Sequence, residues 1–173
     1  MYIELLILIQ IEDSPKHGYE IKKEIQKDLG YLTDVNNNML YPALRKFTEE
    51  GLVTKRINEQ SGGPTQYIYE ITENGKRRIT ELVNAFTERD ARHHSEFLIR
   101  VSLFRYISQD KRLRILNMRM KDLEQLLLNL EERLEQPNID HYRDQVLKVS
   151  ISKLKTEMSW INKLIETVGR EEE

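Results

Sequence analysis

The chain has 173 residues, of which 39% are hydrophobic and 32% are charged, with a formal net charge of -2 at pH 7. These proportions suit a soluble, helix-rich protein that is long enough to bury a core in one large domain or two small ones. It contains no cysteine, which excludes a disulfide framework and thiol chemistry and fits a reducing cytoplasm. We therefore expect a cytoplasmic location.

The charge balance is unusual for a nucleic-acid binder. Residues 1–81 hold 11 Lys and Arg against 13 Asp and Glu, so no overall basic excess is visible. This balance lowers the expected non-specific affinity for DNA. Basic side chains could still cluster in three dimensions, and the candidates are Arg45, Lys46, Lys55, Arg56, Lys76, Arg77 and Arg78.

Residues 1–12 are almost continuously apolar, which predicts a helix buried on most sides. The run is too short to span a membrane and lacks the features of a signal peptide. Asp13-Ser14-Pro15 breaks it. A second helix is predicted from Lys16, with Gly30 as its C-terminal cap.

The third predicted helix begins near Asn38 to Leu40, because Pro42 is tolerated only in a first turn. Its apolar positions recur at i, i+4 and i+7, and Gly51 stands where a left-handed C-terminal cap is needed. Asparagine side chains at its start can cap backbone N–H groups; they are Asn36, Asn37 and Asn38.

Two strands are predicted next, over residues 53–57 and 66–71, with a polar loop over residues 58–65 between them. A fourth helix then opens at Thr72, with Gly75 as a weak point near its start. Three helices followed by a hairpin with an exposed loop are typical of a winged helix-turn-helix. In such a module phosphate contacts set the position, and base edges in the major groove specify the sequence.

Five ordered motifs resemble the PadR family of transcriptional regulators: HGYEI from His17, LYPAL from Leu40, EGLV from Glu50, GGP from Gly62 and YIYEITENG from Tyr67. The resemblance implies a winged-helix DNA-binding domain, a helical dimerisation domain and, usually, repression relieved by a small molecule. One departure is the sequence before Leu40, where small residues are common in the family. Asn36 to Met39 stand there instead, so the target sequence is expected to differ.

Beyond residue 88 the sequence changes to two amphipathic helices, each with a heptad seam of alternating 3- and 4-residue spacing. One seam comprises Leu113, Leu116, Met120, Leu123, Leu127, Leu130 and Leu134; the other comprises Leu147, Ile151, Leu154, Met158, Ile161, Ile165 and Val168. A breaker over residues 136–140 predicts an antiparallel hairpin. Apolar positions beside the seams exceed what two helices can cover, so a second copy is expected as partner.

The fold class predicted from these elements is mostly α with a small β-hairpin. Residues 1–87 form the winged helix-turn-helix DNA-binding domain, and residues 88–173 form an antiparallel, coiled-coil-like helical dimerisation domain. The predicted partners are a double-stranded DNA operator and a second copy of the chain. No cofactor or metal is predicted, and no catalytic constellation points to an enzyme.

The predicted DNA-binding residues have simpler structural alternatives. Tyr19 and Tyr41 could bind phosphates, as their PadR counterparts tend to, or pack between helices. His17 could contact a backbone phosphate of the DNA, or it could cap the second helix. Lys55 could attract DNA electrostatically, or it could be an ordinary charged side chain on the surface of a β-strand. The full set is His17, Tyr19, Asn36, Asn37, Asn38, Tyr41, Pro42, Arg45, Lys46, Lys55 and the loop residues Gly62, Gly63, Pro64 and Thr65.

Three features of the C-terminal half have both a functional and a structural interpretation. His93 and His94 could suggest a metal site, but adjacent histidines diverge on a helix and lack a third ligand at useful spacing. Trp160 could stack on an aromatic small-molecule effector or belong to the core. Arg100 could transmit an effector signal, although a solvated charge is the simpler interpretation. The alternative function for the whole chain is a protein-interaction adaptor that does not bind DNA.

Overall fold

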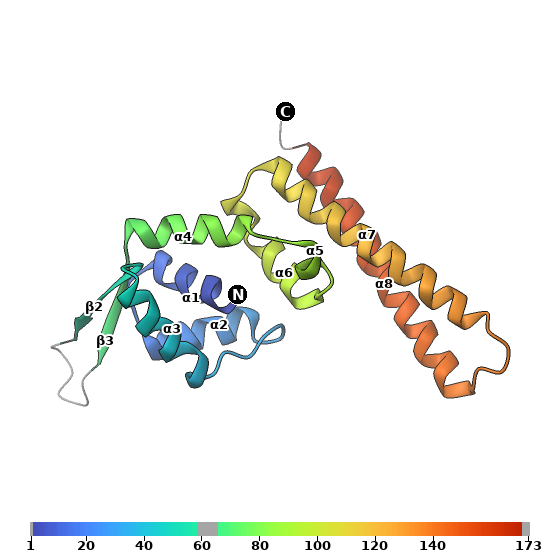
Figure 1. Ribbon diagram of the computed structural model, residues 1–173, viewed down its shortest axis with the longest axis horizontal. Helices are drawn as coiled ribbons and strands as arrows, with labels where there is room; N and C mark the ends of the chain where they lie inside the picture. Colours follow the sequence, from blue (N-terminus) through green and yellow to red (C-terminus); the bar gives the residue numbers. More distant parts are fainter. Residues whose placement is uncertain (1, 59–65, 171–173) are drawn as a thin grey trace. The chain divides into compact units, whose positions relative to one another are not determined.

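The computed structural model describes residues 2–58 and 66–170 (Figure 1). Contacts divide the chain into two compact units. The first comprises Met1–Phe86 with Leu98–Tyr106, and the second comprises Thr87–Phe97 with Ile107–Glu173. Among the described residues, no helix is both long and apolar enough to cross a membrane.

The first unit is built around α1 (Tyr2–Asp13), whose residues 5–11 are all buried. It packs against α2 (Gly18–Leu29), α3 (Asn37–Glu49), α4 (Glu73–Asn84) and the sheet. This confirms the predicted buried first helix. The second helix begins two residues later than predicted, because Lys16 and His17 form a short strand, β1. The buried Lys16 donates from Nζ to the Gln10 carbonyl at 2.6 Å.

Both ends of α3 are fixed by local chemistry. The Asn36 side chain accepts the Met39 N–H at 3.2 Å and starts the helix at residue 37. Pro42 therefore lies in the second turn, not in the first turn as predicted. Because proline has no N–H, the carbonyl four residues earlier loses its helical donor. At the other end Gly51 has the predicted left-handed backbone, with φ of 67°.

Two backbone hydrogen bonds complete the Gly51 turn. Leu52 N–H donates to the Phe47 carbonyl at 2.8 Å, and Gly51 N–H donates to the Thr48 carbonyl at 3.2 Å. This pair is the Schellman arrangement. Gly30 also caps its helix, but with a right-handed backbone, φ of -61° and ψ of -20°.

The sheet has the strand order β1-β3-β2, with both pairings antiparallel. β2 (Val53–Ile57) and β3 (Tyr67–Ile71) are the predicted hairpin. β1 (Lys16–His17) was not predicted; this two-residue strand makes β3 the central one. The loop predicted as a wing, with Gly62, Gly63, Pro64 and Thr65, lies outside the described residues.

Thr72 caps α4 by accepting the Gly75 N–H at 3.1 Å, as its predicted position at the helix start requires. Gly75 is not the weak point that the sequence suggested. A Cβ added there would lie 2.2 Å from the Leu52 carbonyl oxygen. Glycine is needed because the helix and the start of β2 approach too closely for any side chain.

In the second unit α7 (Gln109–Leu134) and α8 (His141–Gly169) form the predicted antiparallel hairpin (Figure 1). The Asp140 side chain caps α8 by accepting the N–H groups of Tyr142 and Arg143. Asn138 adopts φ of 72° in the turn. The second unit also contains α5 (Glu88–Ala91) and the start of α6 (His94–Ser102), whereas the rest of α6 and the 3-10 helix η1 (Phe104–Tyr106) belong to the first unit.

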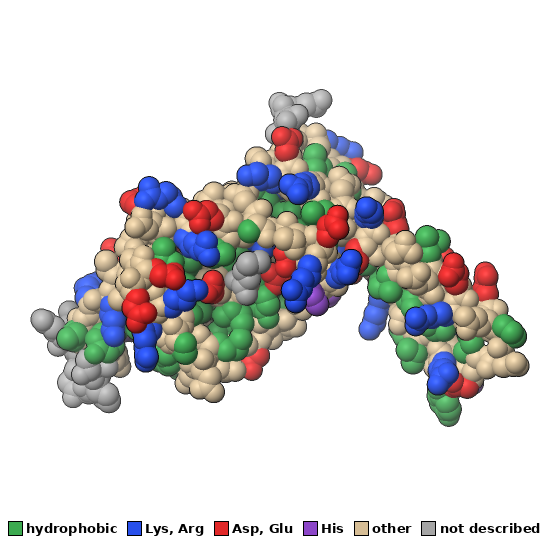
Figure 2. Space-filling view, in the orientation of Figure 1, with side chains coloured by type: hydrophobic (Ala, Val, Ile, Leu, Met, Phe, Trp, Pro, Cys, Tyr) green, Lys and Arg blue, Asp and Glu red, His purple; other side chains and the backbone are tan. Residues whose placement is uncertain are grey.

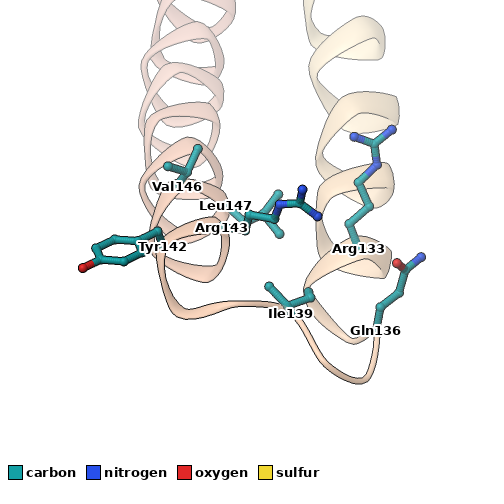
Figure 3. Close-up of a pocket in the computed structure, with 7 residues that line it drawn as sticks. All are labelled: Arg133, Gln136, Ile139, Tyr142, Arg143, Val146 and Leu147. Carbon is teal, nitrogen blue, oxygen red and sulfur yellow. The ribbon is translucent and has the colours of Figure 1, made fainter.

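The seams are buried only in part within one chain. The buried members of the two seams are Leu116, Met120, Leu123, Ile151, Ile161 and Val168. Other apolar side chains of the hairpin are open to solvent: Leu126, Leu128, Val146 and Val149. At the turn, side chains from both helices and the connecting loop line a pocket of about 560 Å³, while Tyr142 points away from α7 (Figure 3).

Candidate nucleic-acid interface

The exposed face of α3 carries polar and aromatic side chains. Asn38, Tyr41 and Arg45 are exposed at i, i+3 and i+7, while the opposite face is buried. Neither Asn38 nor Arg45 has a side-chain hydrogen bond or ion pair with another residue in the part of the chain that the structure describes. The three side chains are therefore available to a ligand on one face of the helix.

Three other predicted residues of α3 and its cap make side-chain contacts within the protein itself. Asn36 is the N-cap, and Asn37 Oδ1 accepts from Lys22 Nζ at 3.4 Å. Lys46 Nζ donates to Glu4 Oε1 on α1 at 2.8 Å. The hydrogen bond and charge of Glu4 raise the pKa of Lys46, with a smaller contribution from Glu50. Of the three asparagines, only Asn38 has no side-chain hydrogen bond to another described residue.

A pocket of about 390 Å³ lies beside this face, where the start of α2 meets α3 and β3. We call it the tyrosine pocket, after the four tyrosines that line it, Tyr19, Tyr41, Tyr67 and Tyr69; its other lining residues are His17, Gly18, Glu20 and Gln66. It brings the predicted residues His17, Tyr19 and Tyr41 together, although Tyr41 lies more than 20 positions away along the chain.

His17 has a structural role in this pocket. Its Nδ1 lies 3.1 Å from the Tyr67 carbonyl oxygen, and its Nε2 lies 3.3 Å from Asn58 Nδ2. A carbonyl can only accept, so this pair of contacts assigns the proton to Nδ1 and leaves Nε2 as an acceptor. Because both ring nitrogens have partners, the ring serves to join β1 to the hairpin.

Tyr41 and Gly18 are in close contact. A Cβ built on Gly18 would lie 3.0 Å from Tyr41 Cε1 and 3.4 Å from its hydroxyl oxygen. The absence of a side chain therefore lets the Tyr41 ring lie at the amino end of α2. Tyr41 is 48% exposed and Tyr19 is 71% exposed, so neither ring is simply packed in the core.

Tyr69 differs from the other three tyrosines. It belongs to the central strand and is only 6% exposed. Burial raises the pKa of its hydroxyl above the usual value, and Tyr41 and Tyr67 raise it further. Tyr67 and Tyr69 were not predicted as site residues. Their alternation with Ile68 was a signal, because it places both tyrosines on one face of the strand.

Positive charge near the pocket comes from β2. Lys55 Nζ lies 3.6 Å from the centre of the Tyr67 ring, within range of a cation–π contact. Figure 2 shows basic and acidic side chains interspersed over the face in view, in line with the balanced charge of the sequence. The described residues of the hairpin therefore place a cation, Lys55, against a tyrosine that lines the pocket.

The helical unit contains an ionic cluster that the sequence analysis missed. Arg119 is 4% exposed. Its guanidinium donates to both carboxylate oxygens of Glu157, at 2.8 and 3.2 Å, and to the Ala91 carbonyl at 2.7 Å. His94 Nδ1 lies 3.1 Å from the same carboxylate. No spacing rule could link residues 94, 119 and 157.

The prediction that Arg100 is a solvated charge is wrong. Its side chain is fully buried, and its guanidinium donates to the Leu82 carbonyl. Trp160 is 37% exposed and makes an edge contact with Phe97, with 6.1 Å between ring centres. A groove of about 690 Å³ runs along α8 beside it, lined in part by Lys155, Ser159 and Lys163.

Residues 6–81 match the Transcriptional regulator PadR-like family. A protein of Bacillus subtilis described as "Negative transcriptional regulator PadR" is 22% identical over 166 residues, which cover 89% of this chain and 90% of that protein. Residues 6–81 therefore carry a PadR-like domain. Members of this family are transcriptional regulators, not enzymes.

Two solved structures are also similar to this chain. The crystal structure of Bacillus subtilis PadR in complex with operator DNA is 19% identical, with a TM-score of 0.47, over 97% of this chain and 99% of that chain. A PadR family regulator from Clostridium difficile R20291 is 28% identical, with a TM-score of 0.42, over 47% of this chain and 83% of that chain.

Proposed function

We propose that this PadR-family regulator is a cytoplasmic, homodimeric, sequence-specific DNA-binding repressor that a small molecule releases from its operator. Residues 1–87 would bind DNA, and residues 88–173 would form the dimer. The observation that carries the proposal is the free polar face of α3, formed by Asn38, Tyr41 and Arg45. A helix of this kind fits the major groove, where asparagine pairs well with adenine and arginine with guanine.

The similarity to the Bacillus subtilis protein supports repression as the output, because that relative is described as a negative regulator and aligns over most of both chains. A two-fold dimer would present two copies of α3. Its operator would then be roughly palindromic, with half-sites one or two helical turns apart.

Dimerisation is supported by the apolar side chains that the α7–α8 hairpin leaves in solvent. Leu128 is 57% exposed and Val146 is 62% exposed. A second copy of the hairpin could cover these positions by the same kind of packing that joins the two seams.

The proposed site for the small-molecule effector lies at Trp160. A half-exposed tryptophan beside an open groove can stack on an aromatic ring, and Trp160 has both features. Ligand binding there would quench the fluorescence of the sole tryptophan in the chain. A panel of aromatic acids, amines and neutral compounds that leaves this fluorescence unchanged would remove the support for this part of the proposal.

The test of DNA binding starts from a pool of random duplexes and from the DNA upstream of the protein's own gene. Fluorescence anisotropy at physiological salt would compare each recovered fragment with a shuffled duplex of equal length and composition. We expect preference for one palindromic sequence and weaker binding as salt rises. If selection recovers no preferred sequence, the repressor proposal fails and the adaptor alternative takes its place.

A further inference from the structure

The boundary between the two units falls inside α6. Residues 94–97 of this helix belong to the second unit, and residues 98–102 belong to the first. The backbone nevertheless forms one continuous helix of 9 residues. A helix whose two halves are both held by packed side chains can pass a displacement from one half to the other. The contacts of each half therefore decide whether α6 is more than a passive connection.

Phe97 holds the first half of α6 beside the tryptophan, and its side chain is fully buried. Its ring meets the Trp160 ring edge-on, with 6.1 Å between ring centres. The guanidinium carbon of Arg119 lies 5.6 Å from the centre of the Phe97 ring, and Arg119 is itself fixed by two hydrogen bonds to Glu157. Because a buried ring has little free space, a ligand that moves Trp160 also moves Phe97.

Arg100 holds the second half of the helix. It follows Phe97 by three positions, so the two side chains are neighbours on one side of α6. Its buried guanidinium donates to the Leu82 carbonyl in the last turn of α4, and its guanidinium carbon lies 5.5 Å from the centre of the Phe86 ring. Separating a buried charge from its hydrogen-bond acceptor is costly. A movement of α6 is therefore passed to the end of α4.

The start of α4 is joined to the end of α3. The Thr72 hydroxyl, which caps α4, lies 2.8 Å from the Gly51 carbonyl oxygen and 2.9 Å from the Leu52 carbonyl oxygen. Gly75 approaches Leu52 so closely that a Cβ on the glycine would lie 2.2 Å from the carbonyl oxygen of Leu52. One helix of 12 residues thus connects the contact made by Arg100 to the turn that ends α3.

We propose that α6 couples the ligand site at Trp160 to α3, and that Phe97 and Arg100 are the positioning residues that carry this coupling through α4. The inference rests on the proposed function, because it states how a ligand at Trp160 changes the affinity for the operator. Coupling between two binding sites is reciprocal. Operator binding must therefore change the surroundings of Trp160, and this consequence can be measured without knowing the ligand.

The test follows the fluorescence of Trp160, the sole tryptophan, while the full chain is titrated with the selected operator. Saturating operator should shift the emission of the wild type and its quenching by acrylamide, whereas the same concentration of shuffled duplex should not. Two variants break the path at different places. Arg100→Met keeps a long side chain in the buried position but removes the donor to Leu82. Phe97→Leu keeps the position apolar but removes the ring contact with Trp160.

Both variants should bind the operator with an affinity close to that of the wild type, because neither residue belongs to α3. Both should lose the response of Trp160 to the operator. Arg105→Met is the matched control, because it makes the same substitution at an arginine whose side chain is 63% exposed, and it should keep the response. Circular dichroism shows which variants are folded, and if one fails to fold the other decides the result.

Three outcomes would overturn the proposal. The first is a wild type that binds the operator tightly without any change at Trp160. The second is a response that survives in a folded Arg100→Met or Phe97→Leu variant, because the coupling then follows another route. The third is a response that Arg105→Met loses as well. If neither the wild type nor Arg105→Met binds any duplex, the proposed DNA binding itself fails, so the two failures are distinguishable.

Discussion

Tyr41 rests against Gly18, so that a methyl group on the glycine would lie 3.0 Å from the edge of the ring. This contact joins the start of α2 to the exposed face of α3. It makes Gly18 a positioning residue for a tyrosine that we expect to touch DNA.

Gly18→Ala should therefore separate stability from binding. Alanine is a better helix former than glycine, and the half-exposed Tyr41 ring can move outward. We expect an unchanged or higher melting temperature together with several-fold weaker operator binding. Gly169→Ala is the matched control, because a Cβ there meets nothing within 4 Å. Equal operator affinity in the two variants would show that the position of Tyr41 does not matter.

Arg45→Ala should weaken operator binding more than Lys46→Ala does. Arg45 has no ion pair with any described residue, whereas Lys46 donates to Glu4 at 2.8 Å. An unpaired cation can release counterions from DNA, and its loss should lower the salt slope by about 0.9. Anisotropy titrations at several salt concentrations measure both slopes. A larger change in Lys46→Ala would mean that DNA displaces Glu4.

Arg119→Ala should destabilise the helical unit. Removing one partner of a buried pair leaves an uncompensated charge, at a cost of about 3–5 kcal/mol. Denaturant unfolding followed by circular dichroism measures this loss. Arg143→Ala is the control, because its ion pair with Asp140 is exposed and should contribute no more than about 1 kcal/mol. Similar midpoints in the two variants would contradict a structural role for the Arg119 cluster.

Glu73 should make stability depend on pH. Lys76, which donates to it at 2.7 Å, lowers the pKa of this carboxyl below 4.5. A carboxyl with a lower pKa in the folded state stabilises the fold above its unfolded pKa, and this contribution is lost as the pH falls through the folded value. Glu73→Gln should thus have a lower urea midpoint than wild type at pH 6. The two midpoints should converge as the pH falls below the lowered pKa of Glu73.

Leu128→Lys and Val146→Lys should weaken the dimer. Each places a charge at an exposed apolar position of the hairpin, where a partner copy would have to bury it. Sedimentation equilibrium should show a dissociation constant raised at least tenfold, while Asn129→Lys, already polar and exposed, should match the wild type. Operator binding should weaken with the dimer. Monomers in the wild-type protein would refute the dimer outright.

Local patterns were enough to predict most elements of this chain. The buried first helix, the Gly51 cap, the hairpin strands and the two equal seams follow from nearest-neighbour chemistry and residue spacing. The order of the five sequence motifs also pointed to the PadR family, whose model matches residues 6–81. These features depend on residues a few positions apart, which is the range over which caps and hydrophobic periods act.

The sequence alone predicted the order of the first four helices, the β2–β3 hairpin and the two long helices, and it placed the candidate interface on α3. Only the tertiary structure decided which side chains remain free. It paired Lys46 with Glu4, used both nitrogens of His17 and buried Arg100 and Arg119. It also brought Tyr69 to Tyr41 and Gly18. The physical reason is that ion pairs, close approaches and the burial of polar side chains depend on contacts between residues far apart in the chain.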